Sequence, residues 1–190
     1  MPGSAPLLIV SVAFCALLLT ASLHELAHII PSALLRNSAF SAQYPGWASL
    51  IPTAAGPAST WACLLGACWV LLRKQDVAVD STRFIWMIAI AASAGYRFVF
   101  IGLVGILHLA LSGTIRFRND EYKIGSMVGI PFELLVMGQL VLTLICWTLI
   151  FRRYRGHIGL GQMTSIVLGL VLGVGAWTAV AYGFDIPMMK

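Results

Sequence analysis

The sequence predicts an all-α membrane protein, a bundle of about five transmembrane helices, and three observations support this fold class. Of the 190 residues, 59% are hydrophobic and only 10% are charged, and the mean hydropathy is +0.91. A soluble domain carries about 25% charged residues, so lipid must cover much of this chain. The apolar residues also form five long segments, separated by short stretches that carry most of the charges and turn formers.

Each of the five apolar segments reaches the length of about 20 residues that a helix needs to cross a bilayer. We expect the spans at about residues 5–35, 48–72, 84–112, 127–151 and 160–184. The first segment has no preceding Lys or Arg, which favours a retained span over a cleaved signal peptide. Residues 1–190 are therefore expected to form one integral-membrane, multi-pass domain surrounded by membrane lipid.

The charges and the cysteines argue against two other kinds of function. The net charge of +5 comes from scattered residues, and no basic run is interleaved with aromatic residues, so nucleic-acid binding is not expected. Lys and Arg are divided almost evenly between the two sides of a five-span bundle, so the positive-inside rule gives no orientation. The four cysteines lie in apolar segments without CxxC spacing, and we interpret them as small buried residues, not as a disulfide framework or a metal site.

The first span contains the sequence His24-Glu25-Leu26-Ala27-His28, which matches the zinc motif HExxH. Positions i and i+4 of a helix face the same way, so both imidazoles can bind one metal ion. Glu25 is placed to take a proton from metal-activated water and to pass it to a leaving amine. Ionisable residues within a span cost about 3 kcal/mol each. Three of them within five residues therefore indicate a functional site.

A catalytic zinc site usually has three protein ligands, so the motif predicts a third ligand elsewhere in the chain. The histidine pair lies about 10–16 Å before the end of the first span, and the third ligand should approach from that side of the membrane. The first connection, the third connection and the C-terminal segment share this side in a five-span bundle. Four carboxylates fit this requirement and remain open at this point: Asp120, Glu121, Glu133 and Asp185.

The HELAH motif in the first span, followed by Ala-Ala-Gly-Pro at residues 54–57 in the next, resembles the site-2 protease family of intramembrane zinc metalloproteases. In that family the third ligand is an Asp near the start of a later helix. The resemblance assigns this role to Asp120 of the Asn119-Asp120 pair, with Glu133 as the alternative ligand. The usual Leu-Asp-Gly form and a PDZ-like insert are both absent, as in compact members. The resemblance implies a Zn²⁺ cofactor, an endopeptidase and a transmembrane protein substrate.

Three positions in the spans are expected to disturb the helices or to need partners. Gly56 and Pro57 should interrupt the second span near the depth of the histidine pair, where an irregular backbone could bind an extended substrate; an ordinary proline kink is the alternative. Pro31 should kink or end the first helix. Arg97 lies within the third span and needs an interior partner, for which Glu133 is a candidate.

Two alternatives to an intramembrane endopeptidase remain open from the sequence. One is a metal-dependent membrane hydrolase of a non-peptide substrate. The other is a membrane metal-binding or scaffold protein without protease activity. Glu25 separates the enzymes from the scaffold, because hydrolysis needs its carboxylate whereas metal binding by His24 and His28 does not.

Overall fold

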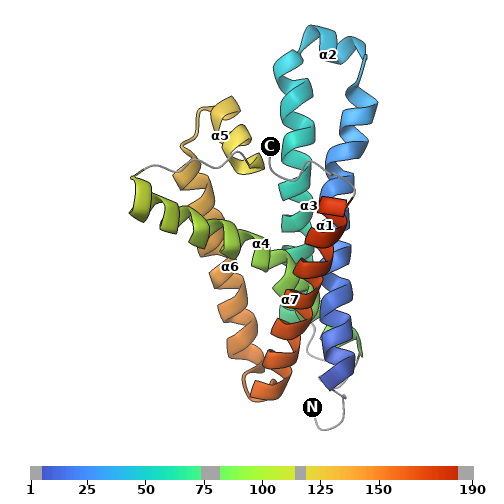
Figure 1. Ribbon diagram of the computed structural model, residues 1–190, viewed down its shortest axis with the longest axis vertical. Coiled ribbons are helices and arrows are strands. Elements are labelled where there is room, and N and C mark those ends of the chain that lie inside the picture. Colours follow the sequence, from blue (N-terminus) through green and yellow to red (C-terminus); the bar gives the residue numbers. More distant parts are fainter. Residues whose placement is uncertain (1–5, 74–81, 114–118, 184–190) are drawn as a thin grey trace.

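The computed structural model describes residues 6–73, 82–113 and 119–183, and these residues form helices without any strand (Figure 1). Five helices are long and apolar enough to cross a membrane: α1 (Pro6–Leu35), α3 (Pro45–Arg73), α4 (Thr82–Ser112), α6 (Phe132–Tyr154) and α7 (Leu160–Gly183). Two short helices lie between them: α2 (Ala39–Gln43) and α5 (Asp120–Val128). The predicted all-α fold with five candidate spans is confirmed.

The boundary between the third connection and the fourth span differs from the prediction. We expected this span to begin at about residue 127, but residues 120–128 form the separate helix α5. The helix ends at Gly129, whose φ of 73° lies in the left-handed region that glycine adopts without strain. Pro131 then precedes the first turn of α6. The turn between α5 and α6 therefore depends on a glycine and a proline that the hydropathy pattern does not resolve.

The prolines do not interrupt their helices. Pro31 lies inside α1, which continues to Leu35, so of the predicted kink or end of the helix the end does not occur. Pro57 lies inside α3, and the expected irregular backbone at Gly56 and Pro57 is also wrong, because α3 is helical throughout. A proline removes one N–H group from the helix, and in a membrane bundle neighbouring groups can satisfy the freed carbonyl.

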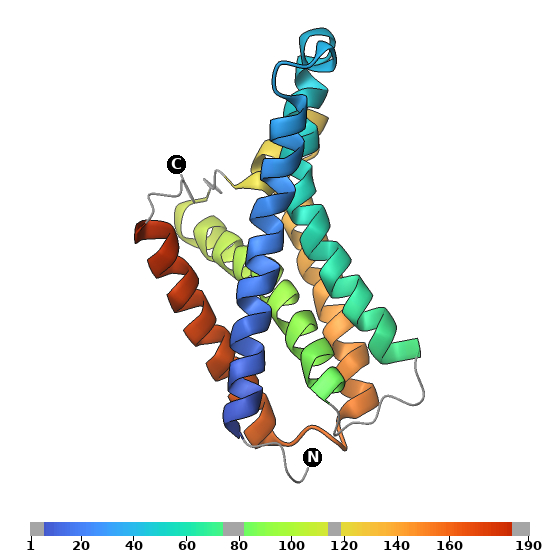
Figure 2. The ribbon, with the colours of Figure 1, turned by 90° about the vertical axis from the view of Figure 1, so that its right-hand side faces the viewer.

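Helix α1 runs along one side of the bundle, on the right in Figure 1 and in front in Figure 2, and contacts α3, α4 and α7. Its contact with α7 is close because two small residues of α7, Gly169 and Gly173 in small-xxx-small spacing, face it. A Cβ atom on Gly169 would lie 2.4 Å from the backbone oxygen of Val10, and one on Gly173 would lie 3.1 Å from Leu17 Cδ2. These glycines therefore allow α7 to pack directly against α1.

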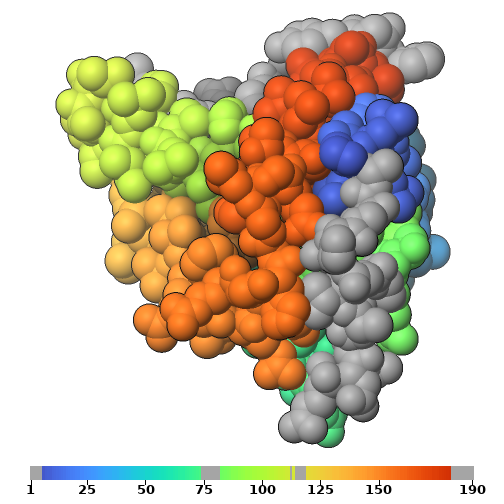
Figure 3. Space-filling model, turned by 90° about the horizontal axis from the view of Figure 1, so that it is seen from below, coloured from blue at the N-terminus to red at the C-terminus, as the bar shows by residue number. Residues whose placement is uncertain are grey.

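The apolar core lies between α3, α4 and α6, where Leu64, Leu71, Phe84 and Phe98 are almost completely buried. Many other large apolar side chains are exposed on the outside of the bundle, as expected for surfaces covered by lipid. Seen from below, the turn between α6 and α7 lies across this face next to the start of α1 (Figure 3).

All four cysteines are free thiols. Cys68 and Cys146 are buried as expected, and Cys63 is partly buried. Cys15 is exposed on the outside of α1, so its predicted burial is wrong. An apolar segment does not show which of its residues face other helices and which face lipid.

Candidate metal centre

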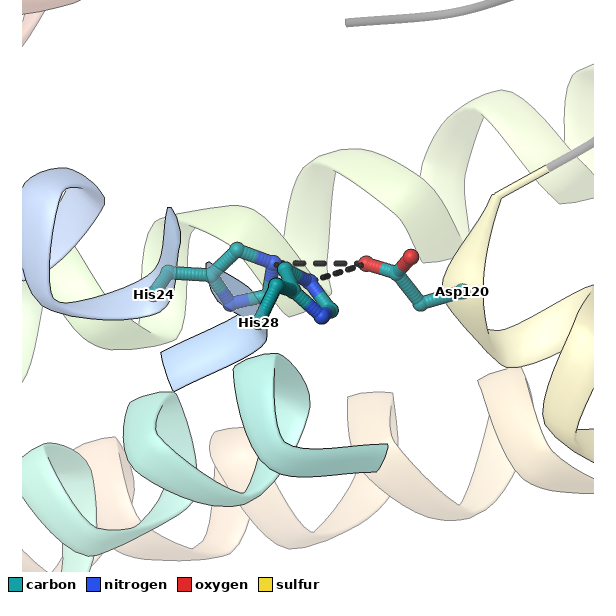
Figure 4. Close-up of side chains that lie close together, drawn as sticks. All are labelled: His24, His28 and Asp120. Carbon is teal, nitrogen blue, oxygen red and sulfur yellow. Dashed lines mark hydrogen bonds and ion pairs between the residues drawn. The ribbon is translucent and has the colours of Figure 1, made fainter. Parts of the chain in front are cut away.

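Three side chains from two helices point toward one another beside α3 (Figure 4). His24 and His28 lie one turn apart on α1, and their Nε2 atoms are 3.1 Å apart. Asp120, in the first turn of α5, places Oδ2 3.3 Å from each of these two nitrogens. Within residues 6–73, 82–113 and 119–183, these three residues form the group of ligand side chains that could hold a metal ion.

The second nitrogen of each imidazole has a hydrogen-bond acceptor on α3. The Nδ1 of His28 is 2.7 Å from the carbonyl oxygen of Pro52, which can only accept. The Nδ1 of His24 is 2.9 Å from the hydroxyl oxygen of Thr60, which itself donates to the carbonyl of Gly56 at 3.3 Å. Both rings therefore donate from Nδ1, and a neutral ring of this kind carries its lone pair on Nε2.

This arrangement suits a cation bound between the three side chains. Two nitrogen lone pairs and a carboxylate oxygen repel one another at 3.1–3.3 Å unless a positive charge lies between them. Ligands bound tetrahedrally to zinc at 2.0–2.1 Å lie about 3.3 Å apart, and two histidines with one carboxylate are a known zinc set. The donor atoms thus match a zinc ion in both chemistry and spacing.

The group is closed on one side and open on the other. The His24 side chain is only 4% exposed, whereas those of His28 and Asp120 are each 21% exposed. A catalytic zinc site keeps one position free for water or substrate. The partial exposure of His28 and Asp120 leaves a side from which either could approach.

Gly56 lies directly beneath the two imidazole rings. A Cβ atom at this position would lie 2.1 Å from His28 Nε2 and 2.8 Å from His24 Cε1. Both distances are shorter than real Cβ contacts, so any larger residue would displace the rings. Gly56 and Pro57 are themselves buried within α3. Their predicted contact with substrate stays a prediction, and the geometry gives Gly56 a different role, which is to make room for the histidines.

Asp120 reaches the histidines because α5 begins at this residue. Asn119 caps the helix, and its side-chain oxygen accepts a hydrogen bond of 2.9 Å from the Tyr122 N–H. Burial raises the pKa of Asp120, but the positive charge of the neighbouring Arg97 opposes this effect, and the pKa lies below its usual value. Asp120 is therefore a carboxylate at neutral pH, as a zinc ligand must be.

The other carboxylates considered as third ligands have different positions. Glu133 lies in the first turn of α6 with an exposed side chain and does not belong to the group around the histidines. Glu121 is buried and faces Arg97, and Asp185 lies outside the described residues. Of the candidates that the structure describes, only Asp120 lies beside the histidine pair.

The predicted pairing of Arg97 with Glu133 is wrong. Arg97 Nη2 instead lies 2.9 Å from Asp120 Oδ2 and 3.6 Å from Glu121 Oε1. Helix α5 lies between the third and fourth spans and brings both carboxylates to Arg97. The sequence prediction lacked this helix and therefore chose the carboxylate nearest in depth within the next span.

Two contacts of the site were not anticipated, the Thr60 hydroxyl and the Pro52 carbonyl. Both lie four residues from Gly56, so all three positions share one face of α3. That spacing was available in the sequence once Gly56 was assigned to the site. The hydrogen bonds themselves could not be inferred, because they depend on how far α3 is shifted along α1.

No protein-family model, no curated protein and no solved structure matches this chain significantly. The resemblance to site-2 proteases therefore stays a prediction from three short motifs: HELAH, Ala-Gly-Pro and Asn-Asp.

Proposed function

We propose that this protein is a zinc-dependent intramembrane endopeptidase, in which His24, His28 and Asp120 hold Zn²⁺ and Glu25 is the general base. One observation carries the proposal: three electron-pair donors lie 3.1–3.3 Å apart while the Nδ1 atoms of both histidines are engaged by α3. A partly buried group of electron-pair donors held this close together would be unfavourable without a cation between them.

Glu25 supplies the proton transfer that peptide hydrolysis needs. It follows His24 in α1, and its side chain is partly buried. Bound zinc would supply Lewis acidity, polarising the scissile carbonyl and lowering the pKa of water towards neutrality. The Glu25 carboxylate would take a proton from water during its attack on the carbonyl and would deliver that proton to the leaving amine.

A peptide bond within or near the membrane is the substrate that best fits the surroundings of this group. The histidine pair lies within a helix of 30 residues that is apolar enough to cross a membrane. A transmembrane helix has its amides bonded internally, so a substrate must unwind locally before it can be cut. The resemblance of HELAH, Ala-Gly-Pro and Asn-Asp to site-2 proteases supports the same substrate class.

Zinc quantification on the purified full-length chain tests the metal site first. We expect about one zinc per chain in the wild type, its loss in Asp120→Ala, and its retention in Glu133→Ala, because Glu133 is exposed and outside the group. Zinc lost from Glu133→Ala but kept in Asp120→Ala would reverse the ligand assignment. Absence of zinc from the wild type would overturn the proposal.

A Glu25→Gln variant then tests catalysis. It should retain zinc, because Glu25 is not a proposed ligand, and lose hydrolysis of a labelled transmembrane peptide that carries a Gly-Pro helix breaker. Full biological activity in Glu25→Gln would indicate a metal-binding or scaffold protein instead. Hydrolysis of a lipid ester but of no peptide in the same detergent would indicate a non-peptide hydrolase.

A further inference from the structure

Arg97 and Glu121 form a second charged layer behind the proposed ligand Asp120. Arg97 projects from α4, while Asp120 and Glu121 are neighbours in the first turn of α5. The Arg97 Nη2 atom lies 2.9 Å from Asp120 Oδ2 and 3.6 Å from Glu121 Oε1. One guanidinium nitrogen therefore contacts both carboxylates.

Glu121 is in an unfavourable position for an ordinary acidic residue. It is only 1% exposed, and neither of its oxygens has a hydrogen-bond partner among the described residues. A buried carboxylate without such partners is costly unless a nearby charge compensates it. Arg97 provides that charge. The Nε of Arg97 is also buried without a partner in the described structure, so neither residue is held there by a rich hydrogen-bond network.

We infer that Arg97 is a positioning residue that orients Asp120 for zinc, and that Glu121 balances the charge of Arg97 so that Asp120 remains available to the metal. This inference rests on the proposed function. The count of charges agrees with these two roles. Asp120 and Glu25 would balance the two positive charges of Zn²⁺, and Glu121 balances the positive charge of Arg97. Partners of this kind, one step behind the ligand, fix the direction of a ligating carboxylate.

The same contacts explain why Glu121 has a separate role from Asp120. Without Glu121, the charge of Arg97 would act on Asp120 alone and would compete with zinc for the same oxygen, Oδ2. Without Arg97, Asp120 would lose its contact of 2.9 Å, and Glu121 would remain as an uncompensated buried charge. Removing the charge of either residue alone therefore changes both the geometry and the net charge of the site.

A double variant separates these two effects. Arg97→Gln with Glu121→Gln removes the pair while leaving the net charge of the site as it is in the wild type. We expect zinc affinity, measured on the full chain in detergent by competition with a chelator, to fall about 10–100-fold, the range for loss of such partners. The absorption bands of Co²⁺ bound in place of zinc should also change, because they report ligand geometry. Glu133→Gln is the matched control, since it removes an exposed carboxylate.

Single variants provide an independent measurement if the double variant does not fold. Arg97→Lys keeps the charge but loses the planar guanidinium, and it should weaken zinc binding less than Arg97→Gln does. Glu121→Gln should weaken binding while Asp120 and Arg97 are both intact.

The outcomes are distinguishable from failure of the proposed function. The positioning role would be overturned if the wild type binds zinc and the double variant binds it with equal affinity and an unchanged Co²⁺ spectrum. If the double variant then differed only in a lowered melting temperature, the ion pair would be purely structural. Wild type that binds no zinc would overturn the proposed function, and this inference with it.

Discussion

Two helices each bring a glycine close to α1, from two different sides, and the two contacts have different consequences. On one side, Gly56 of α3 lies beneath the rings of His24 and His28. On the other, Gly169 of α7 faces the backbone oxygen of Val10. An imidazole ring can rotate away from an added methyl group, whereas a helix backbone cannot move without its neighbours. The first contact therefore controls the site, and the second controls assembly of the bundle.

The largest effect is expected from Gly56→Ala. Its Cβ would lie 2.1 Å from His28 Nε2, so the rings must turn out of the position in which they face Asp120. We expect zinc affinity to fall more than about 100-fold, beyond the effect of losing an outer hydrogen bond. The helical fold should persist, since only side-chain ends need to move.

Gly66→Ala is the matched control for this variant. It lies on the same helix, and a Cβ there would meet no described atom within 4 Å. We expect unchanged zinc binding and a small gain in stability from the higher helix propensity of alanine, about 1 kcal/mol at most. Equal zinc affinities in Gly56→Ala and Gly66→Ala would contradict the role assigned to Gly56.

Gly169→Ala should give the next largest effect, on stability and not on zinc. The added Cβ would lie 2.4 Å from Val10 O and 2.7 Å from Ala13 Cβ, so α7 must move away from α1. Overpacking of this kind costs about 1–3 kcal/mol. The melting temperature in detergent should fall, while the folded fraction binds zinc as the wild type does.

Gly175→Ala serves as the control on α7, because a Cβ there would meet no described atom within 4 Å. It should not lower the melting temperature. A loss of zinc affinity in Gly169→Ala at temperatures where the bundle is intact would show that the two contacts are coupled through α1.

Thr60→Val tests the contact between α3 and His24 at the metal site. The hydroxyl of Thr60 accepts from His24 Nδ1 at 2.9 Å, and a methyl group in its place leaves this N–H without an acceptor. We expect zinc affinity to fall about 10-fold, at the lower end for loss of such a contact. Thr60→Ser retains the hydroxyl and should restore most of the affinity; no rescue by serine would mean that shape, and not the hydrogen bond, matters at this position.

The comparison also explains what the sequence could and could not predict. The five spans follow from hydropathy, and the close contact of α7 follows from the spacing of Gly169 and Gly173, because both are properties of one segment. HELAH likewise places His24 and His28 on one face of a single helix. These inferences required no knowledge of how the helices are placed relative to one another.

The features that failed depend on two segments at once. The partner of Arg97 was wrong because α5, a short helix of low hydropathy, brings Asp120 and Glu121 to α4. The break expected at Gly56 and Pro57 was wrong because composition alone does not show that glycine is needed to fit the rings of a neighbouring helix. The choice of Asp120 over Glu133 came from the family resemblance, and the geometry now supports it independently.

Thr20→Val is expected to give the smallest effect, and it tests whether the two regions of α1 act separately. Thr20 lies one turn before His24 and three residues after Leu17, which faces Gly173. Its hydroxyl is 3.3 Å from that of Ser93 on α4, a contact within the bundle. Polar contacts between membrane helices contribute about 0.6 kcal/mol on average, so the melting temperature should fall only slightly.

Zinc affinity in Thr20→Val should change less than about 2-fold, because the Thr20 hydroxyl bonds to the Leu17 carbonyl and to Ser93 and not to a side chain of the metal group. Combining Thr20→Val with Ser93→Ala should cost little more than either change alone, since both remove the same hydrogen bond. If Thr20→Val instead lowered zinc affinity as much as Thr60→Val, the position of His24 would depend on the packing of α4. The conclusion that the metal site and the packing contacts of α1 act separately would then be wrong.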